Sequence, residues 1–259
     1  AEPAVLAALS PEDVAGDVRL PEEPPVPAER VDAWLGVDVG SVSTNLVVMS
    51  ERLEVLHGVY LPTRGRPVEA LDDGLTRIRE RFGERLRVVG VGATGSGRHL
   101  AAKVLGADVV RNEITAQLVS AARYVPEVDT IFEIGGQDSK YIAVEHGQLV
   151  DFEMNKICAA GTGSFLEEQA ERLGVNIVGE FGDRALVAAR PRDLGTRCTV
   201  FMDTELVRAQ ESGAPVEDLC AGLSYSVSRN YLEKVVAGRP VGRCIVFQGG
   251  TASNAAVVA

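Results

Sequence analysis

Residues 129–154 read DTIFEIGGQDSKYIAVEHGQLVDFEM, and this stretch decides the fold. It holds three runs with the length and the apolar, β-branched composition of strands: 129–134, 139–145 and 148–154. Gly135-Gly136 separates the first two runs, and His146-Gly147 separates the last two, as turn sequences do. The stretch therefore predicts three consecutive strands, with the acidic Glu133 beside the first turn.

The same order of elements occurs earlier in the chain. From Trp34 onward, three apolar runs predict an antiparallel meander of strands: 34–39, 44–49 and 54–60. Gly40-Ser41 is the turn between the first two. Apolar spacing and short apolar runs predict helices at 66–82, 112–124, 163–173, 203–210 and 215–236, and strands at 87–92 and 243–248, the last one buried. Strand, glycine turn, strand, strand and helix thus appear twice, which predicts an α/β protein with two similar halves at 34–126 and 127–259.

Residues 1–33 differ in composition from the rest. They hold eight acidic and two basic residues, and six of the 12 prolines in the chain. Such a segment has too little apolar surface to offset the entropy lost on ordering. We therefore predict an acidic, proline-rich linker that ends where the first strand begins.

The composition of the whole chain limits the partners and the environment. The net charge is −11 and the isoelectric point is near 4.9, which disfavours binding to nucleic acid because phosphate backbones are repelled. No apolar run reaches the roughly 18 residues of a membrane span. Four cysteines without a CxxC pair are too few for a disulfide framework. We therefore expect a cytoplasmic protein with reduced thiols, no membrane and no nucleic acid.

Three glycine turns carry the candidate chemistry. Two of them follow an acidic residue at a strand end, Asp38 before Gly40 and Glu133 before Gly135, and the third is the small-residue run 248–254. Glycine lets several backbone N–H groups converge on one phosphate. Two opposed hairpins with carboxylates suit a Mg²⁺-polyphosphate, since magnesium prefers water, carboxylate and phosphate oxygens. Neither GxxxxGK[ST] nor a post-strand GxGxxG is present, so P-loop and dinucleotide sites are not expected.

These turns resemble the two phosphate motifs and the adenosine motif of the actin-like superfamily of sugar kinases, actin and heat-shock chaperone ATPases. A narrower resemblance, to the BadF/BadG/BcrA/BcrD ATPase family, rests on six motifs: GATGSGR (92–98), NEITAQ (112–117), FEIGGQDSK (132–140), NKICAAGTGSF (155–165), RCTVFMDTE (197–205) and FQGGTASN (247–254). The resemblance implies an actin-like (RNase H-like) fold of duplicated halves, each a mixed sheet flanked by helices. It covers the chain from about Trp34 to Ala259.

The resemblance also implies an ATP site. Asp38 and Glu133 would hold Mg²⁺ through its waters, and Asp138 would orient the attacking water. The residues expected to bind phosphates are Gly40, Ser41, Ser43, Thr44, Gly135, Gly136 and Gln137, and those expected at the ribose and adenine are Gly249, Gly250 and Thr251. Family members continue through a further strand and helices after this last turn, so the second half is expected to be truncated at its C-terminus.

The resemblance further implies a homodimer that shares one oxygen-sensitive [4Fe-4S] cluster, with Cys158 and Cys198 as the ligands from each chain. The two cysteines are 40 residues apart, so one chain offers two ligands, and twofold symmetry would supply the other pair. Each precedes a predicted helix, whose N-terminal amides stabilise thiolate. Cys220 and Cys244 are expected to pack in the core.

The function implied is an ATP-dependent electron-transfer activator that reduces a partner 2-hydroxyacyl-CoA dehydratase or acyl-CoA reductase through the cluster. Two other functions remain open from the sequence. An actin-like sugar or metabolite kinase would be colourless and would phosphorylate a hydroxyl substrate. In a non-enzymatic nucleotide-binding regulator, both cysteines would be incidental.

Overall fold

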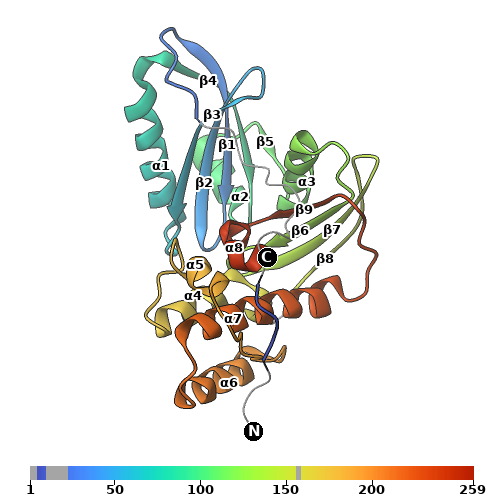
Figure 1. The fold of residues 1–259 in the computed structure, drawn as a ribbon. Coiled ribbons are helices and arrows are strands. Elements are labelled where there is room, and N and C mark those ends of the chain that lie inside the picture. Colours follow the sequence, from blue (N-terminus) through green and yellow to red (C-terminus); the bar gives the residue numbers. More distant parts are fainter. Residues whose placement is uncertain (1–4, 10–22, 156–158) are drawn as a thin grey trace. The chain divides into compact units, whose positions relative to one another are not determined.

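The computed structural model describes residues 5–9, 23–155 and 159–259, and we discuss only these (Figure 1). The chain divides into two compact units, which we describe separately. The first unit comprises residues 18–120, and the second comprises residues 1–17 and 121–259. In the part of the chain that the structure describes, no helix is long and apolar enough to cross a membrane.

The first unit contains a five-stranded mixed sheet in the order β3-β2-β1-β4-β5. The strands are β1 (Val31–Val39), β2 (Ser43–Ser50), β3 (Val55–Pro62), β4 (Leu86–Thr94) and β5 (Val109–Val110). The first three strands pair antiparallel, and β4 and β5 continue the sheet in parallel from β1. The predicted meander is thus confirmed.

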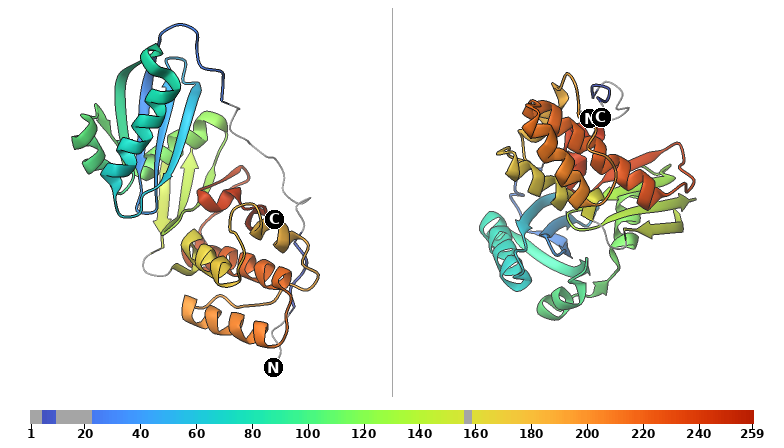
Figure 2. Two further views of the ribbon diagram at one scale, coloured as in Figure 1. Left: turned by 90° about the vertical axis from the view of Figure 1, so that its left-hand side faces the viewer. Right: turned by 90° about the horizontal axis from the view of Figure 1, so that it is seen from below.

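Between residues 23 and 124, all of which the structure describes, lie three α-helices: α1 (Pro67–Phe82), α2 (Arg98–Leu105) and α3 (Glu113–Tyr124), of which α3 crosses the boundary between the units. Leu35, Val37 and Val39 alternate along β1 and therefore share a face of the sheet. They belong to one apolar cluster with Leu71 of α1 and Ala101 of α2. α1 lies along this sheet (teal in Figure 2), so burial of its apolar stripe joins helix to sheet.

The second unit contains a four-stranded mixed sheet in the order β8-β7-β6-β9. Its strands are β6 (Thr130–Ile134), β7 (Ser139–Glu145), β8 (Gln148–Met154) and β9 (Ile245–Gln248). The strands β6, β7 and β8 form an antiparallel meander, and β9 pairs in parallel with β6. The first four strands of the other unit have the same arrangement, which confirms the predicted duplication.

The described residues of the second unit also form five α-helices: α4 (Gly163–Arg172), α5 (Phe181–Leu186), α6 (Thr199–Glu211), α7 (Val216–Tyr231) and α8 (Ala255–Val258). A π-helical turn, Leu232–Val236, extends α7. All five helices contribute to one apolar cluster, in which α7 is buried along most of its length. Tyr231, at the end of α7, packs against Tyr141 of β7 and thereby joins the helices to the sheet.

The predicted strands and long helices are confirmed with ends that differ by a few residues, but some elements were missed. α2, α5, α8 and the two-residue strand β5 were not predicted. The predicted burial of strand 243–248 is wrong, because Ile245 is 45% exposed. Its place at the edge of the sheet explains this, since β9 has a strand neighbour on one side only.

The described parts of the predicted linker, residues 5–9 and 23–33, contact the folded units. Near the N-terminus, the Leu6 amide donates to the Pro191 carbonyl (2.8 Å), and the Tyr225 hydroxyl donates to the Ala7 carbonyl (3.1 Å), both within the second unit. In the first unit, Glu23 accepts a hydrogen bond from the Gly58 amide (2.7 Å). These hydrogen bonds attach the described parts of residues 1–33 to each unit.

Candidate active site

The first candidate hairpin joins β1 to β2. Asp38 lies near the end of β1 with Asn45 opposite it on β2, and the Gly40 amide donates to the Ser43 carbonyl (2.8 Å). Thr63 supports the turn from the end of β3, because its hydroxyl donates to the Gly40 carbonyl (2.9 Å). The same hydroxyl lies 2.9 Å from that of Thr44, which is fully buried. Neutral hydroxyl groups thus hold this turn in place.

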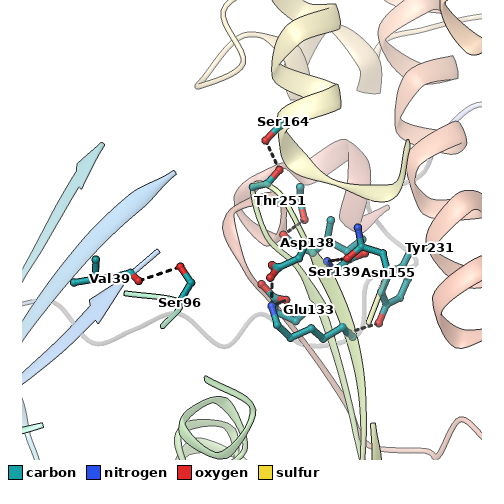
Figure 3. Close-up of polar contacts among 12 residues, drawn as sticks. Val39, Ser96, Glu133, Asp138, Ser139, Asn155, Ser164, Tyr231 and Thr251 are labelled. Atoms are coloured by element: carbon teal, nitrogen blue, oxygen red, sulfur yellow. Dashed lines mark hydrogen bonds and ion pairs between the residues drawn. The ribbon is translucent and has the colours of Figure 1, made fainter. Parts of the chain in front are cut away.

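The end of β4 supports the same hairpin. Gly95 has φ +86°, and a Cβ added there would lie 2.3 Å from Asp38 Oδ1 and 2.5 Å from the Val39 carbonyl oxygen. Only glycine tolerates this conformation together with such a close approach. The Gly97 amide donates to the Val39 carbonyl (2.8 Å), and Ser96 Oγ also faces that carbonyl (Figure 3). Parallel pairing of β1 and β4 therefore brings a second glycine turn against the carboxylate.

The second candidate hairpin joins β6 to β7 and has the same backbone construction. Glu133 lies near the end of β6 with Lys140 opposite it on β7, and the Gly135 amide donates to the Asp138 carbonyl (2.9 Å). Gly249 follows the parallel strand β9 with φ +94°, and a Cβ added there would lie 2.5 Å from the Ile134 carbonyl oxygen. The register, the turn bond and the positive-φ glycine all repeat the first hairpin.

Three further contacts fix the second turn. The Thr251 hydroxyl donates to the Ile134 carbonyl (2.8 Å). At the start of α4, the Gly163 amide donates to the Gly135 carbonyl (2.8 Å) and the Ser164 amide to the Gly136 carbonyl (2.7 Å). The Ser164 hydroxyl points to the same turn (Figure 3). The first amides of α4, which have no partner within the helix, are therefore used to hold this turn.

The charges of the second hairpin meet at one lysine. Lys140 Nζ lies 2.9 Å from Glu133 Oε2 and 2.8 Å from Asp138 Oδ1, and the side chains of Lys140 and Glu133 are 2% and 6% exposed. Figure 3 shows Glu133 and Asp138 close together on the hairpin. Burial alone would lower the pKa of Lys140, but the carboxylates of Glu133 and Asp138 outweigh burial and raise this pKa to about 12.

The structure brings the predicted nucleotide residues together in two groups, one in each unit. The hairpin of the first unit carries Asp38, Gly40, Ser41, Ser43 and Thr44. The hairpin of the second unit and the adjoining turn carry Glu133, Gly135, Gly136, Gln137, Asp138, Gly249, Gly250 and Thr251. The tips are accessible, since Ser41, Gln137, Gly249 and Gly250 are exposed. Thr44 and Thr251 are buried and bonded within the protein, so the geometry gives them a supporting place; their expected ligand contacts remain predictions.

The sequence did not single out Lys140, Thr63 or Gly95. The signal for Lys140 was present in its spacing, because a hairpin that closes between Gly135 and Asp138 places Lys140 opposite Glu133. The other two residues come from distant strands, and their contacts depend on strand pairing rather than on local spacing.

The carboxylates and turn amides of both hairpins suit the magnesium-nucleotide that the sequence implies. Carboxylate oxygens and exposed turn amides are the types of group that bind a magnesium-nucleotide. In the second hairpin, Lys140 already places a positive charge between the two carboxylates. A magnesium ion bound there would share its ligands with an ammonium group.

Of the two proposed cluster ligands, Cys158 lies outside the described residues. Cys198 is exposed and directly precedes α6, and its carbonyl accepts the Phe201 amide (3.0 Å) and the Met202 amide (3.2 Å). The helix therefore begins next to this cysteine, earlier than the predicted start at Asp203. Among the described residues, no three His, Cys, Asp or Glu side chains gather as a metal site within one chain.

The remaining cysteines differ from each other. Cys220 is fully buried, which confirms its predicted place in the core, and burial raises the pKa of its thiol to about 12. Cys244 is only partly buried, so its expected core packing is wrong. Its amide donates to Asp129 Oδ2 (3.0 Å), which fixes the backbone just before β9 rather than burying the thiol.

The sequence and structure are both similar to known proteins. The model of the BadF/BadG/BcrA/BcrD ATPase family matches residues 35–259. The (R)-2-hydroxyglutaryl-CoA dehydratase activating ATPase of Acidaminococcus fermentans is 30% identical over 225 residues, 85% of this chain and 83% of that protein. The activator of lactoyl-CoA dehydratase of Anaerotignum propionicum is 30% identical over 230 residues, 86% of this chain and 85% of its own length.

Two solved structures confirm the predicted fold. Component A of the (R)-2-hydroxyglutaryl-CoA dehydratase of Acidaminococcus fermentans superposes with a TM-score of 0.79 at 27% identity, covering 87% of this chain and 85% of that one. The activator of the 2-hydroxyisocaproyl-CoA dehydratase from Clostridium difficile, with bound ADPNP, gives 0.75 at 27% identity and covers 87% and 82%. The fold is the actin-like one, with two mixed sheets flanked by helices.

Proposed function

The chain belongs to the BadF/BadG/BcrA/BcrD ATPase family, and from this membership we propose that it is an ATP-dependent activator of a partner enzyme, a 2-hydroxyacyl-CoA dehydratase or an acyl-CoA reductase. The observation that carries the proposal is the match to dehydratase activators over 85% of the chain in sequence and 87% in structure. One of the similar structures holds a bound ATP analogue, which supports a nucleotide site in this fold.

The residues of the two hairpins give this activity a plausible chemistry. Bound Mg²⁺ would offset the charge of the ATP phosphates. From the resemblance, Asp38 and Glu133 would hold its water ligands, and Asp138, whose side chain is 42% exposed, would orient the water that attacks the γ-phosphate. The amides at the exposed turn tips bind phosphate oxygens. Gly249, Gly250 and Thr251 would lie on the side of the ribose and adenine.

We extend the proposal to a homodimer that shares one [4Fe-4S] cluster through Cys158 and Cys198 of each chain. The cluster would supply the low-potential electron that reduces the partner enzyme. The exposure of Cys198 supports this role, because a thiol at the surface can be reached by a second chain. Its position at the start of α6 also supports it, since the helix N-terminus favours negative charge.

The hydrogen bonds at the start of α4 suggest how nucleotide binding could change the surroundings of the proposed cluster. The Gly163 and Ser164 amides are bonded to the carbonyls of Gly135 and Gly136, the residues proposed to bind phosphate. Gly163 follows Cys158 by only five positions in the sequence. A shift of the turn on binding or hydrolysis would therefore be passed to the backbone near this cysteine.

Iron and sulfide analysis of protein purified without oxygen tests the cluster. Wild-type protein should be coloured, with about four iron atoms per dimer. Cys198→Ser should be colourless, because two of the four thiolates are lost per dimer, and Cys158→Ser should behave in the same way. The matched control is Cys220→Ser, which should keep the iron. Equal iron content in Cys198→Ser and wild type would remove the shared cluster from the proposal.

A second assay separates an activator from the kinase that the sequence left open. The activator should hydrolyse ATP and reduce an acceptor dehydratase in the presence of a strong reductant. A kinase would instead consume ATP in proportion to an added sugar and release a phosphosugar. Phosphosugar formation by iron-free protein would overturn the proposed function.

A further inference from the structure

Lys140 is a buried lysine whose ammonium group contacts both carboxylates of the second hairpin. It lies 2.9 Å from Glu133 and 2.8 Å from Asp138. Its backbone is fixed as well, because the Tyr231 hydroxyl donates to the Lys140 carbonyl (2.8 Å). Lysine is rarely buried unless it is paired. The side chain is therefore held where it bridges the two acids.

The hairpin itself does not need a lysine at this position. In the first unit, the residue opposite the strand-end acid is Asn45, on a hairpin with the same turn bond and register. Asn45 Nδ2 lies 3.5 Å from Ser43 Oγ, in the place where Lys140 contacts Asp138. The same backbone thus forms with a neutral amide and a neutral hydroxyl. What the lysine adds is charge.

That charge competes with a metal ion. Without it, Glu133 and Asp138 would be two adjacent carboxylates, an arrangement that attracts divalent cations. The positive charge of Lys140 offsets negative charge at the two carboxylates, and the oxygens that face Nζ accept its hydrogen bonds. A metal ion alone gains less from such a site, whereas a metal ion that arrives with phosphate groups is held by the turn amides as well.

We propose that Lys140 is a positioning residue that holds Glu133 and Asp138 together and keeps divalent metal ions out of this hairpin until a nucleotide brings one. The proposal rests on the ATPase function proposed above. Lys140 acts through the two carboxylates, so removing it should loosen Asp138 and at the same time strengthen the binding of free metal. A purely structural lysine would produce the first of these effects at most.

The first test is metal binding without nucleotide, measured by calorimetric titration of the full chain with Mn²⁺. Lys140→Asn introduces the residue type found at the equivalent position of the first hairpin, Asn45. It should lower the Kd for Mn²⁺ by about tenfold or more, since it removes a positive charge from beside the two carboxylates. Lys140→Arg keeps the charge and should bind Mn²⁺ as weakly as wild type. Lys234→Asn is the control, an exposed lysine of the same unit. Equal Mn²⁺ affinity in Lys140→Asn and wild type overturns the proposal.

The second test is hydrolysis at saturating Mg²⁺-ATP. Lys140→Asn should lower kcat by roughly 30-fold or more while KM changes less than about threefold, because Asp138 loses its orientation but phosphate binding does not. Lys140→Asn/Asp138→Asn should be no slower than Asp138→Asn alone, since both act at one group. Additive losses would overturn the link to Asp138. Thermal unfolding of each variant checks the fold, and Lys140→Arg, which should retain part of the turnover, carries the test if Lys140→Asn unfolds.

The two assays give different results if the proposed ATPase function fails and if the proposed role of Lys140 fails. Wild-type protein that does not hydrolyse ATP, together with tighter Mn²⁺ binding by Lys140→Asn, would reject the ATPase while supporting the exclusion of metal by Lys140. Hydrolysis by wild type, with Lys140→Asn unchanged in both assays, would reject the role of Lys140 and leave the ATPase in place.

Discussion

The two hairpins share a backbone but differ in their charges. In each, a glycine amide closes the turn, and a positive-φ glycine from the parallel neighbour strand lies against the carbonyl that follows the acid. In the first hairpin the acid Asp38 faces Asn45, and the turn is supported by threonine hydroxyls. In the second, Glu133 faces Lys140, which also contacts Asp138.

This difference separates what the duplicated fold requires from what a site requires. The repeated features are backbone features: strand register, the closing hydrogen bond and a glycine where no side chain fits. The features that differ are side chains that a ligand would meet. Duplication of the fold therefore accounts for the two similar turns, and the contacts of Lys140 with Glu133 and Asp138 set the second hairpin apart from the first.

The largest expected effect comes from removing the acid of either hairpin. Asp38→Asn and Glu133→Gln should each lower ATP turnover by roughly 10²- to 10³-fold, because each removes a carboxylate that is proposed to hold the magnesium ion through its waters. The two should differ in stability. Glu133→Gln removes a carboxylate that contacts the buried Lys140 and should unfold more easily, whereas the partly buried Asp38 should matter less.

Steady-state hydrolysis and thermal unfolding of the two variants check this prediction. Glu168→Gln changes an exposed carboxylate of the second unit and is the control for both measurements. Normal turnover in Asp38→Asn would show that only the second hairpin takes part in hydrolysis. Equal loss of stability in the two variants would remove the distinction between the hairpins.

The next effect concerns the positive-φ glycines. Gly95→Ala and Gly249→Ala should each cost about 3 kcal/mol of unfolding free energy, because strain at positive φ adds to a clash with a backbone carbonyl. Gly65→Ala is the matched control: its φ is +69° and a Cβ there would meet no atom within 4 Å, so only about 1 kcal/mol is expected. Urea unfolding measures these costs.

The position of Trp34 lets the two hairpins be observed separately. It is the single tryptophan of the chain and lies on β1, so its fluorescence reports on the first unit, while circular dichroism reports on both. Gly95→Ala should move the fluorescence transition, and Gly249→Ala should not. A cost at Gly95 no larger than at Gly65 would contradict the close approach to Asp38.

The sequence predicted the backbone of the two hairpins better than it predicted their side-chain contacts. Alternating apolar residues and glycine turns located both meanders, because strand period and turn residues are local signals. α2 was missed because Ala101 is its one buried residue and thus gives no apolar stripe. Lys140 and Gly95 were missed as site residues because their contacts arise from pairing between strands. β1 and β4, which bring Gly95 to Asp38, are separated by more than 45 residues.

Alkaline pH should have a smaller effect on the unfolding free energy, and this effect comes from the second hairpin only. The pKa of Lys140 rises from 10.5 to about 12 on folding, so its contribution to stability is complete below pH 10.5 and is lost as the pH rises through about 12. Buried Tyr231 also has a raised pKa and adds to this loss. Urea unfolding between pH 9 and 12 should therefore show a steeper decline in wild type than in Lys140→Asn, and parallel declines would contradict the assigned ion pairs.

The smallest expected effect tests whether the supporting hydroxyls are equivalent. Thr63→Val and Thr251→Val each remove a donor to a turn carbonyl without changing side-chain shape, and each should cost about 1 kcal/mol of unfolding free energy. Thr63→Val should lower the unfolding free energy more, because it also removes the hydrogen-bond partner of the Thr44 hydroxyl, which is fully buried. Thr44→Val/Thr63→Val should then recover part of the loss, since no buried hydroxyl is left without its partner. If the double variant is instead the least stable, the two hydroxyls act independently, and the neutral support of the first hairpin is a pair of separate bonds rather than one network.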